Sequence, residues 1–201
     1  MYALVEDNTI TRTYNNPRGM TIGGVQYPQN IHSLWSESDL NAIGIYTVVY
    51  DNTNKKDEKW YTNTDQTLAF AGGVVTASYG TATAKLLEDR NEVDEDDNPL
   101  LDDLGNQVVT KGLKTIKKEM IDRQCAGLLQ DSDWRVIKAK ETGTTMDAGW
   151  KSWRASVRTK CNSMQDQIDG ASDVDALATL FTYTETDGVQ SRPLGEFPIK
   201  E

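Results

Sequence analysis

The sequence predicts an α+β fold, in which a small, mainly antiparallel β domain over residues 1–85 precedes a helical hairpin or three-helix domain over residues 111–183. An acidic linker or protruding hairpin over residues 86–110 separates them, and an extended tail covers residues 184–201. Three observations predict this division. β-branched and aromatic residues cluster early in the chain, carboxylates are concentrated between the domains, and apolar residues then recur at helical spacing.

The front domain is expected to contain short strands joined by turns. The strands are expected at about residues 2–6, 9–14, 20–27, 45–50, 66–70 and 74–83. Asp7 and Asn8 form a two-residue hairpin turn between the first two strands, because both residue types tolerate positive φ. Ser36 and Asp39 form an approximate capping box for a short helix that Gly44 ends.

The charge along the chain is unevenly distributed. Residues 88–110 carry nine acidic residues and one basic residue, whereas residues 111–160 carry a net charge of +6. Because the acidic segment directly precedes the basic one, the two can attract each other within or between subunits. The formal net charge of the chain is −10, which argues against nucleic-acid binding as its main task.

The acidic segment partly matches a calcium-binding loop. Asp94, Asp96 and Asn98 have the spacing of the first three ligands of such a loop. However, Pro99 stands where glycine is required, and Gly105 stands where a bidentate glutamate is required. The pattern therefore fails as a calcium-binding loop, and a solvated linker without a metal site is expected. Weak calcium binding by the clustered carboxylates is the alternative.

The rear domain is expected to form two long helices and one short helix. Apolar residues at steps of three and four predict a helix over residues 113–130 and a second from near Met146 to Gly170, with a loop over residues 135–149. Ser172 is expected to cap the short third helix. Helices joined by loops this short pack antiparallel.

The two cysteines, Cys125 and Cys161, lie on the two long predicted helices. Two buried thiols are the simplest interpretation. A disulfide requires the two helices to pack side by side, and a reducing cytosol disfavours it.

No common catalytic constellation is recognisable. The single histidine, His32, is expected in a surface loop beside Ser33, which is too near in sequence to serve as its nucleophile without a third partner. We expect neither a cofactor nor a metal. Trp134, Trp150 and Trp153 could form a sugar-binding platform. However, Trp150 and Trp153 lie on one helix face in phase with Val157 and Met164, which favours a packed core.

No apolar run approaches the roughly 20 residues that span a bilayer, so membrane insertion is not expected. The first residues show no basic region and no long apolar stretch, so no secretory signal is expected. The protein is therefore expected in the cytoplasm or inside a particle assembled there.

Two segments carry a resemblance to a known family. Residues 123–134, RQCAGLLQDSDW, and residues 150–158, WKSWRASVR, resemble the phage tail assembly chaperone family. In that family an arginine, two leucines and a Ser/Thr-Asp-Trp segment precede a W-x-x-[YW]-R-x-x-[LV]-R segment. The match covers about 40 residues. The order of a β-rich front, an acidic segment and a helical rear also resembles uncharacterised virion proteins of marine phages.

The resemblance implies a partner-binding surface or the core of a helical hairpin. Nine residues would form it: Arg123, Leu128, Leu129, Trp134, Trp150, Trp153, Arg154, Val157 and Arg158. In the structural interpretation the apolar members close the hairpin, and the three arginines pair with carboxylates such as Asp133.

The function that the resemblance implies is a non-enzymatic structural or attachment protein of a bacteriophage tail or tail fibre. Such a protein is retained in the virion, after assembly in the host cytoplasm. Its partners would be other tail or fibre proteins, and it would be a homo-oligomer or be present in several copies. The alternative is a transient tail-fibre assembly chaperone. A third class is a virion carbohydrate-binding or hydrolytic module, although no pattern selects a pair of facing carboxylates.

Overall fold

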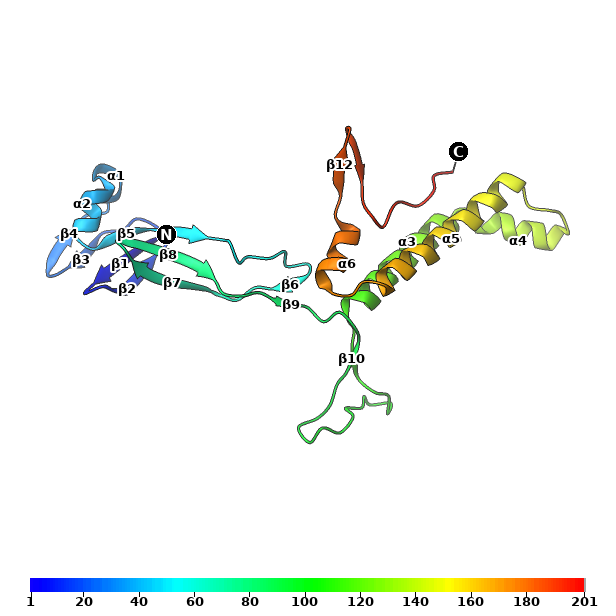
Figure 1. The fold of residues 1–201 in the computed structure, drawn as a ribbon, viewed down its shortest axis with the longest axis horizontal. Coiled ribbons are helices and arrows are strands. Elements are labelled where there is room, and N and C mark those ends of the chain that lie inside the picture. The colour runs from blue at the N-terminus through cyan, green and yellow to red at the C-terminus, as the bar shows by residue number, and fades with distance from the viewer. Residues whose placement is uncertain (201) are drawn as a thin grey trace. The chain divides into compact units, whose positions relative to one another are not determined.

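The computed structural model describes residues 1–200, and the chain divides into two compact units, Met1–Thr83 and Ala84–Glu201 (Figure 1). A curled five-stranded sheet and six helices make up most of the regular structure of the described part. The predicted mixture of helices and strands is therefore confirmed. Each unit is described below by itself.

The first unit is built on one sheet with the strand order β2-β1-β5-β8-β7. The strands are β1 (Tyr2–Glu6), β2 (Thr9–Tyr14), β5 (Ile45–Asp51), β7 (Gln66–Ala71) and β8 (Val74–Tyr79). Neighbouring strands are antiparallel except β5 and β8, which are parallel. The edge strands β2 and β7 approach each other, so the sheet curls without closing into a continuous ladder.

Shorter elements flank this sheet. They are the hairpin of β3 (Met20–Ile22) and β4 (Val25–Tyr27), the helices α1 (Ile31–Leu34) and α2 (Glu37–Ala42), and the pair of β6 (Tyr61–Thr62) and β9 (Thr83–Ala84). The predicted β1–β2 turn is confirmed, since Asp7 and Asn8 have φ of 51° and 60°. Ser36 and Asp39 form the predicted capping box of α2.

Gly44 ends α2 for two reasons. Its φ is +84°, and a Cβ atom there would lie 2.5 Å from the carbonyl oxygen of Val5. The amide of Val5 donates to the carbonyl of Gly44 at 2.8 Å, so the backbone approaches β1 closely at this point. A side chain would push the helix off the sheet.

Apolar clusters lie on both faces of the sheet. Leu4 belongs to one cluster and its neighbours Ala3 and Val5 to the other, as expected when side chains alternate along a strand. The first cluster includes Ile31 of α1 and Leu40 of α2, so the two helices cover that face. The second contains residues of β5 and β8 and fills the inside of the curl.

His32 is not the surface loop residue that the sequence suggested. It lies in α1, with its ring centroid 4.6 Å from that of Tyr2 and 5.7 Å from that of Tyr14. Both ring nitrogens are shielded from solvent and make no well-formed hydrogen bond. Burial lowers the pKa of His32, and the nearby backbone of Arg18 offsets this only in part.

The second unit contains a branched hairpin, four helices and a C-terminal hairpin. The hairpin strands are β10 (Arg90–Asn91) with β11 (Val109–Thr110), and β12 (Thr184–Thr186) with β13 (Val189–Ser191). The helices are α3 (Leu113–Gln130), α4 (Asp133–Thr142), α5 (Ala148–Asp169) and α6 (Val174–Phe181). None of the helices among residues 1–200 is both long and apolar enough to cross a membrane.

The predicted boundaries of the long helices are close to the observed ones, but three details differ. A helix, α4, occupies residues expected to form a loop; it has no buried residue, and therefore no apolar stripe to reveal it. Asp173, not Ser172, caps α6 by accepting from the amide of Ala176 at 2.7 Å. Residues 184–191 form a hairpin rather than an extended tail, with Asp187 and Gly188 at positive φ.

The burial of His32 predicts a pH dependence for the first unit. Because its folded-state pKa lies below the ordinary 6.5, the neutral ring favours folding. This contribution is present above pH 6.5 and is lost as the pH falls through the lowered pKa. Between about pH 8 and about pH 5, the melting temperature of His32→Phe should fall less than that of the wild type. Equal pH profiles for the two proteins would contradict this.

Candidate interaction surface on the helical unit

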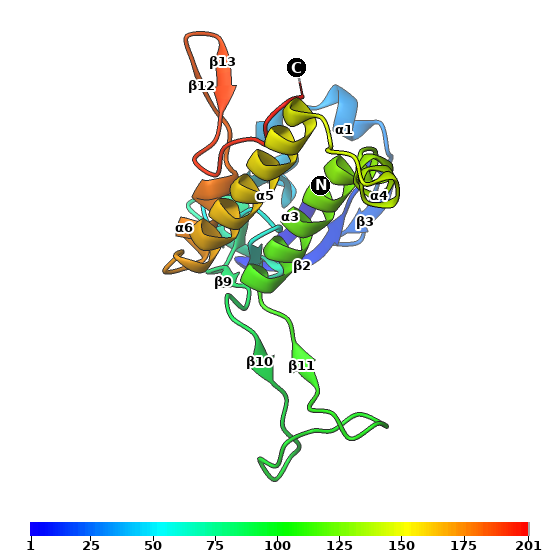
Figure 2. The same cartoon turned by 90° about the vertical axis from the view of Figure 1, so that its right-hand side faces the viewer.

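The pair formed by α3 and α5 is the core of the second unit. Ile121 of α3 and Val157, Met164 and Ile168 of α5 are fully buried. The helices run antiparallel, since the end of α3 lies beside the first half of α5 and its start lies beside Asp169 (Figure 2). Side chains buried in this way stabilise by about 1.5–3 kcal/mol each.

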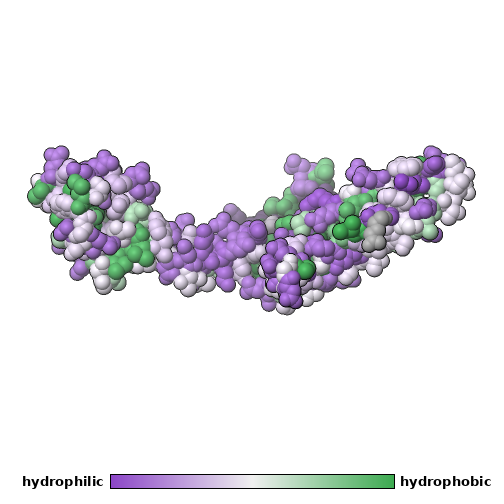
Figure 3. All heavy atoms as spheres, turned by 90° about the horizontal axis from the view of Figure 1, so that it is seen from above, coloured by the Kyte–Doolittle hydropathy of each residue, from purple (hydrophilic) through white to green (hydrophobic). Residues whose placement is uncertain are grey.

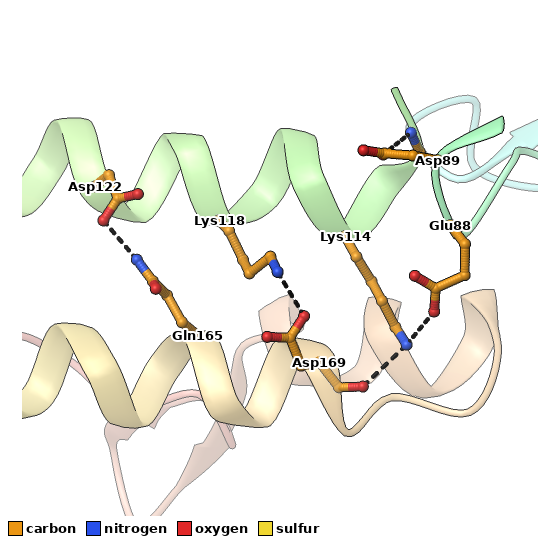
Figure 4. A network of polar contacts seen from close by, with 8 residues as sticks. Glu88, Asp89, Lys114, Lys118, Asp122, Gln165 and Asp169 are labelled. Atoms are coloured by element: carbon orange, nitrogen blue, oxygen red, sulfur yellow. Dashed lines mark hydrogen bonds and ion pairs between the residues drawn. The ribbon is translucent and has the colours of Figure 1, made fainter. Parts of the chain in front are cut away.

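Polar side chains also join the two helices along one edge (Figure 4). Lys118 Nζ donates to Asp169 Oδ1 at 2.7 Å, and this hydrogen bond is the main cause of the raised pKa of Lys118. Lys114, of which 8% is exposed, donates to the backbone carbonyl of Asp169 at 2.9 Å and to the carboxylate of Glu88. Lys114 therefore ties the start of α3 to the end of α5.

The two cysteines are buried neighbours across this pair, and neither forms a disulfide. The prediction of two buried thiols is confirmed. Burial, the adjacent Cys125 thiol and Asp122 raise the pKa of Cys161 to about 12. This thiol stays protonated at neutral pH and is a poor nucleophile.

Arg154 joins α5 to the junction between α3 and α4. Its side chain is buried; Nη1 donates to the carbonyl of Leu129 at 2.7 Å and to the hydroxyl of Ser132, and Nη2 pairs with Asp133 Oδ1 at 2.6 Å. The carbonyl of Leu129 is one of those that α3 leaves without an intrahelical partner, and a cation is favoured at this end of a helix. Arg154 therefore fixes where α4 begins.

Aromatic rings and cations alternate beside this junction. The guanidinium of Arg135 lies 4.6 Å from the ring centroids of both Trp134 and Trp150, and Lys200 lies 5.3 Å from the ring of Trp150. Trp153 packs edge-on against Trp150 at 5.6 Å, and its Nε1 donates to the carbonyl of Pro198 at 3.0 Å. These contacts hold the C-terminal segment against α5.

A groove runs between α4 and the start of α5. It has a volume of about 440 Å³ and is lined by Val136, Thr144, Thr145, Met146, Lys151, Arg154 and Arg158. Within residues 1–200, neither Lys151 nor Arg158 has an ion-pair partner. Among the apolar side chains of α4, Trp134 (52%), Val136 (44%) and Ile137 (56%) are exposed, and Val136 lines the groove. The space-filling view shows apolar side chains among polar ones at the surface of this unit (Figure 3).

The structure separates the nine predicted residues into three groups by burial. Val157 and Arg154 are buried, Leu129, Trp150 and Trp153 are half-buried, and Leu128, Trp134, Arg123 and Arg158 are exposed. The expected pairing of Arg154 with Asp133 is confirmed. Arg123 pairs with another carboxylate, that of Glu119, at 3.9 Å, and Arg158 instead lines the groove. The prediction that the apolar members of this set form a packed core is therefore wrong for the exposed Leu128 and Trp134.

The acidic segment folds into a branched hairpin that the sequence only partly indicated. Three backbone hydrogen bonds form a ring at its branch point: Glu92 donates to Val108 at 2.9 Å, Val108 to Leu100 at 2.8 Å and Leu100 to Glu92 at 2.9 Å. Gln107 Nε2 lies within this ring, at 2.7, 3.1 and 2.9 Å from the carbonyl oxygens of Glu92, Leu100 and Val108, and its two N–H groups are shared among them. The stem of β10 and β11 therefore divides into two prongs, residues 94–98 and 102–106 (Figure 2).

The two prongs are built in the same way. In the first, the carboxylate of Asp94 accepts from the amides of Asp96 and Asn98 at 2.9 Å. In the second, Asp102 accepts from Leu104 at 2.9 Å and from Asn106 at 2.8 Å. These hydrogen bonds lower the pKa of both carboxyls. The sequence signal for this repeat is an Asp-x-x-x-Asn pattern that recurs eight residues later.

The hairpin is anchored at the start of α3. The amide of Gly112 donates to Asp89 Oδ1 at 2.8 Å, and those of Leu113 and Lys114 donate to the carbonyls of Leu86 and Leu87. These bonds satisfy amides that the helix itself cannot pair. A Cβ atom on Gly112 would lie 2.4 Å from the backbone of Glu88, so only glycine permits this close approach.

Comparison with protein-family models, with curated proteins and with solved structures found no match for this chain. Among residues 1–200 no group of three or more His, Cys, Asp or Glu side chains is arranged to hold a metal ion.

Arg154→Met should destabilise the protein by about 2–3 kcal/mol, because it leaves Ser132 buried without its donor and the end of α3 without its cation. Arg158→Met, one turn further along α5, is the matched control. It should change stability by less than about 0.5 kcal/mol, since Arg158 is exposed. Urea unfolding measures both. Equal losses in the two variants would contradict the role assigned to Arg154.

Asp102→Ala should loosen the second prong, because two amides lose their acceptor. We expect severalfold faster hydrogen exchange at Leu104 and Asn106, with exchange in α3 unchanged. The control is Asp103→Ala, since the carboxylate of Asp103 makes no hydrogen bond or ion pair with the described residues. Unchanged exchange in Asp102→Ala would show that other contacts hold the prong.

Proposed function

We propose that this protein is a non-enzymatic structural or attachment component of a bacteriophage tail or tail fibre, retained in the virion. The observation that carries the proposal is α4, a ten-residue helix without a buried residue, whose apolar side chains Trp134, Val136 and Ile137 are about half exposed. Trp134 and Ile137, three residues apart, share one face of the helix, whereas Val136 lines the groove. Exposed apolar side chains that gather on a folded domain mark surfaces that bind other proteins. Partner proteins of the tail or fibre would cover this helix.

The resemblance to the tail assembly chaperone family supports the same location. Its first segment ends at Trp134 in the first turn of α4, and its second begins at Trp150 in the first turn of α5. The exposed Arg158 of the second segment lines the groove. Arg154, which also belongs to the motif, holds the start of α4 in place. The motif therefore combines residues that are exposed at the surface, Trp134 and Arg158, with one that fixes the position of α4, Arg154.

A transient tail-fibre assembly chaperone is the second candidate. It is favoured by the same exposed helix, because a chaperone must offer an apolar surface that it later gives up. In this case α4 would mask a fibre segment during assembly in the host cytoplasm, and the protein would be absent from the finished particle.

A carbohydrate-binding role is less well supported by the aromatic residues. A sugar platform needs an open aromatic face, whereas Arg135 lies over both Trp134 and Trp150 at 4.6 Å. Lys200 lies over Trp150 as well. The rings are therefore engaged by cations of the same chain.

Quantitative mass spectrometry of purified particles tests the proposal. We expect peptides of this chain at a constant ratio to the major tail protein. Presence in the infected lysate together with absence from particles would overturn the structural role and favour the chaperone.

A pair of variants tests the surface. Ile137→Asp should reduce incorporation into particles, because it places a charge within the apolar face of α4. Val189→Asp, at a similarly exposed position of β13 (65% against 56% for Ile137), is the matched control and should be incorporated normally. Equal incorporation of both variants would exclude the face of α4 that carries Trp134 and Ile137 as the contact.

A further inference from the structure

The branched hairpin and the groove beside α4 have complementary chemistry. The second prong carries Leu104, which is 86% exposed, next to Asp103, whose carboxylate has no partner within residues 1–200. The groove carries apolar Val136 and Met146 beside Lys151 and Arg158, neither of which has an ion-pair partner within residues 1–200. An apolar tip with an adjacent carboxylate matches an apolar groove with an adjacent cation.

The first prong adds to this attraction. Glu95, Asp96 and Asp97 lie on it, all exposed, and their carboxylates accept no hydrogen bond from the described part of the chain. The groove lies in the segment of residues 111–160, which has a net charge of +6. Facing charges of opposite sign on two surfaces speed their encounter and set their orientation.

The branched hairpin and the groove lie at opposite ends of α3, so the prong of one copy cannot reach the groove of the same copy. The hairpin is anchored at the start of the helix by Gly112 and Lys114. The groove lies beyond its other end, where Arg154 binds the carbonyl of Leu129. A helix of 18 residues is about 27 Å long. Figures 1 and 2 agree that the hairpin leaves the helical pair at the end where α3 begins.

We propose that the second prong of one copy of this chain, residues 102–106, docks in the groove between α4 and α5 of a second copy. Leu104 packs against Val136 and Met146, and Asp103 pairs with Arg158 or Lys151. This proposal deepens the proposed tail role and rests on it, since it names one partner as the chain itself.

The contact has a direction. Prong and groove are different surfaces, so the association is head-to-tail and leaves one free prong and one free groove on every pair. Copies therefore extend into a ring or an open filament. A single prong buries less area than a stable interface needs, so the contact is weak in dilute solution and is strengthened by low salt.

Two full-length variants test the proposal by sedimentation velocity over a range of concentrations. The prong variant combines Asp103→Ala with Leu104→Ser, and the groove variant is Arg158→Glu. Each alone should associate at least tenfold more weakly than the wild type. The matched controls are Glu185→Ala with Val189→Ser in the C-terminal hairpin and Arg12→Glu in β2, and both should associate like the wild type.

Mixing the two variants is the decisive step. The groove variant retains a working prong and the prong variant retains a working groove, so an equimolar mixture should form pairs that do not extend further. Thermal unfolding confirms that each variant is folded. The proposal is overturned if the wild type stays monomeric up to about 1 mM at low salt, if the variants associate like the wild type, or if the mixture forms no pairs.

Failure of the prong–groove contact can be distinguished from failure of the proposed tail role. The sedimentation experiment uses purified protein alone, so a negative result removes this interface and leaves the particle measurement to decide the role. Absence from particles would instead remove the role, whatever the purified protein does.

Discussion

The second unit depends on one buried cation. Arg154 reaches from α5 to the C-terminal end of α3 and to the first residue of α4, and it contacts Leu129, Ser132 and Asp133. α4 contributes no buried side chain of its own, so little apolar packing fixes its position. The ionic and hydrogen-bonding contacts of Arg154 therefore fix the position of α4, which in most helices is fixed by the packing of an apolar face.

The other end of α3 is fixed in a comparable way. Asp89 and the carbonyls of Leu86 and Leu87 receive the first amides of the helix, and Lys114 joins Glu88 to the end of α5. A rigid helical pair thus carries a different surface at each end. One end presents an acidic branched hairpin, and the other presents an exposed helix and a basic groove.

Most regular elements were predictable because their patterns are local. The helix over residues 113–130, the turn at Asp7 and Asn8 and the cap at Ser36 each depend on neighbouring residues, and the structure contains all three. The helix α4 was not predictable from periodicity, since periodicity reports burial and this helix has none. The C-terminal hairpin was overlooked, although Asp187 and Gly188 form a recognisable turn.

The candidate site was predictable only in part. The Trp and Arg positions of the two motif segments indicated where the surface lies, but not which residues are buried. His32 and Arg154 show why: each is enclosed by residues distant in sequence, namely Tyr2 with Tyr14 and Leu129 with Asp133. The branched hairpin depends on Gln107, which meets three carbonyls from three chain segments. No local pattern marks such a residue.

That partners bind the two ends of the helical unit is best tested by hydrogen exchange of the full chain, free in solution and within purified particles. We expect protection to increase in α4 and in residues 102–106 on incorporation, while the α3–α5 core is protected in both states. Protection that increases only within Met1–Thr83 would contradict this and assign partner binding to the curled sheet instead.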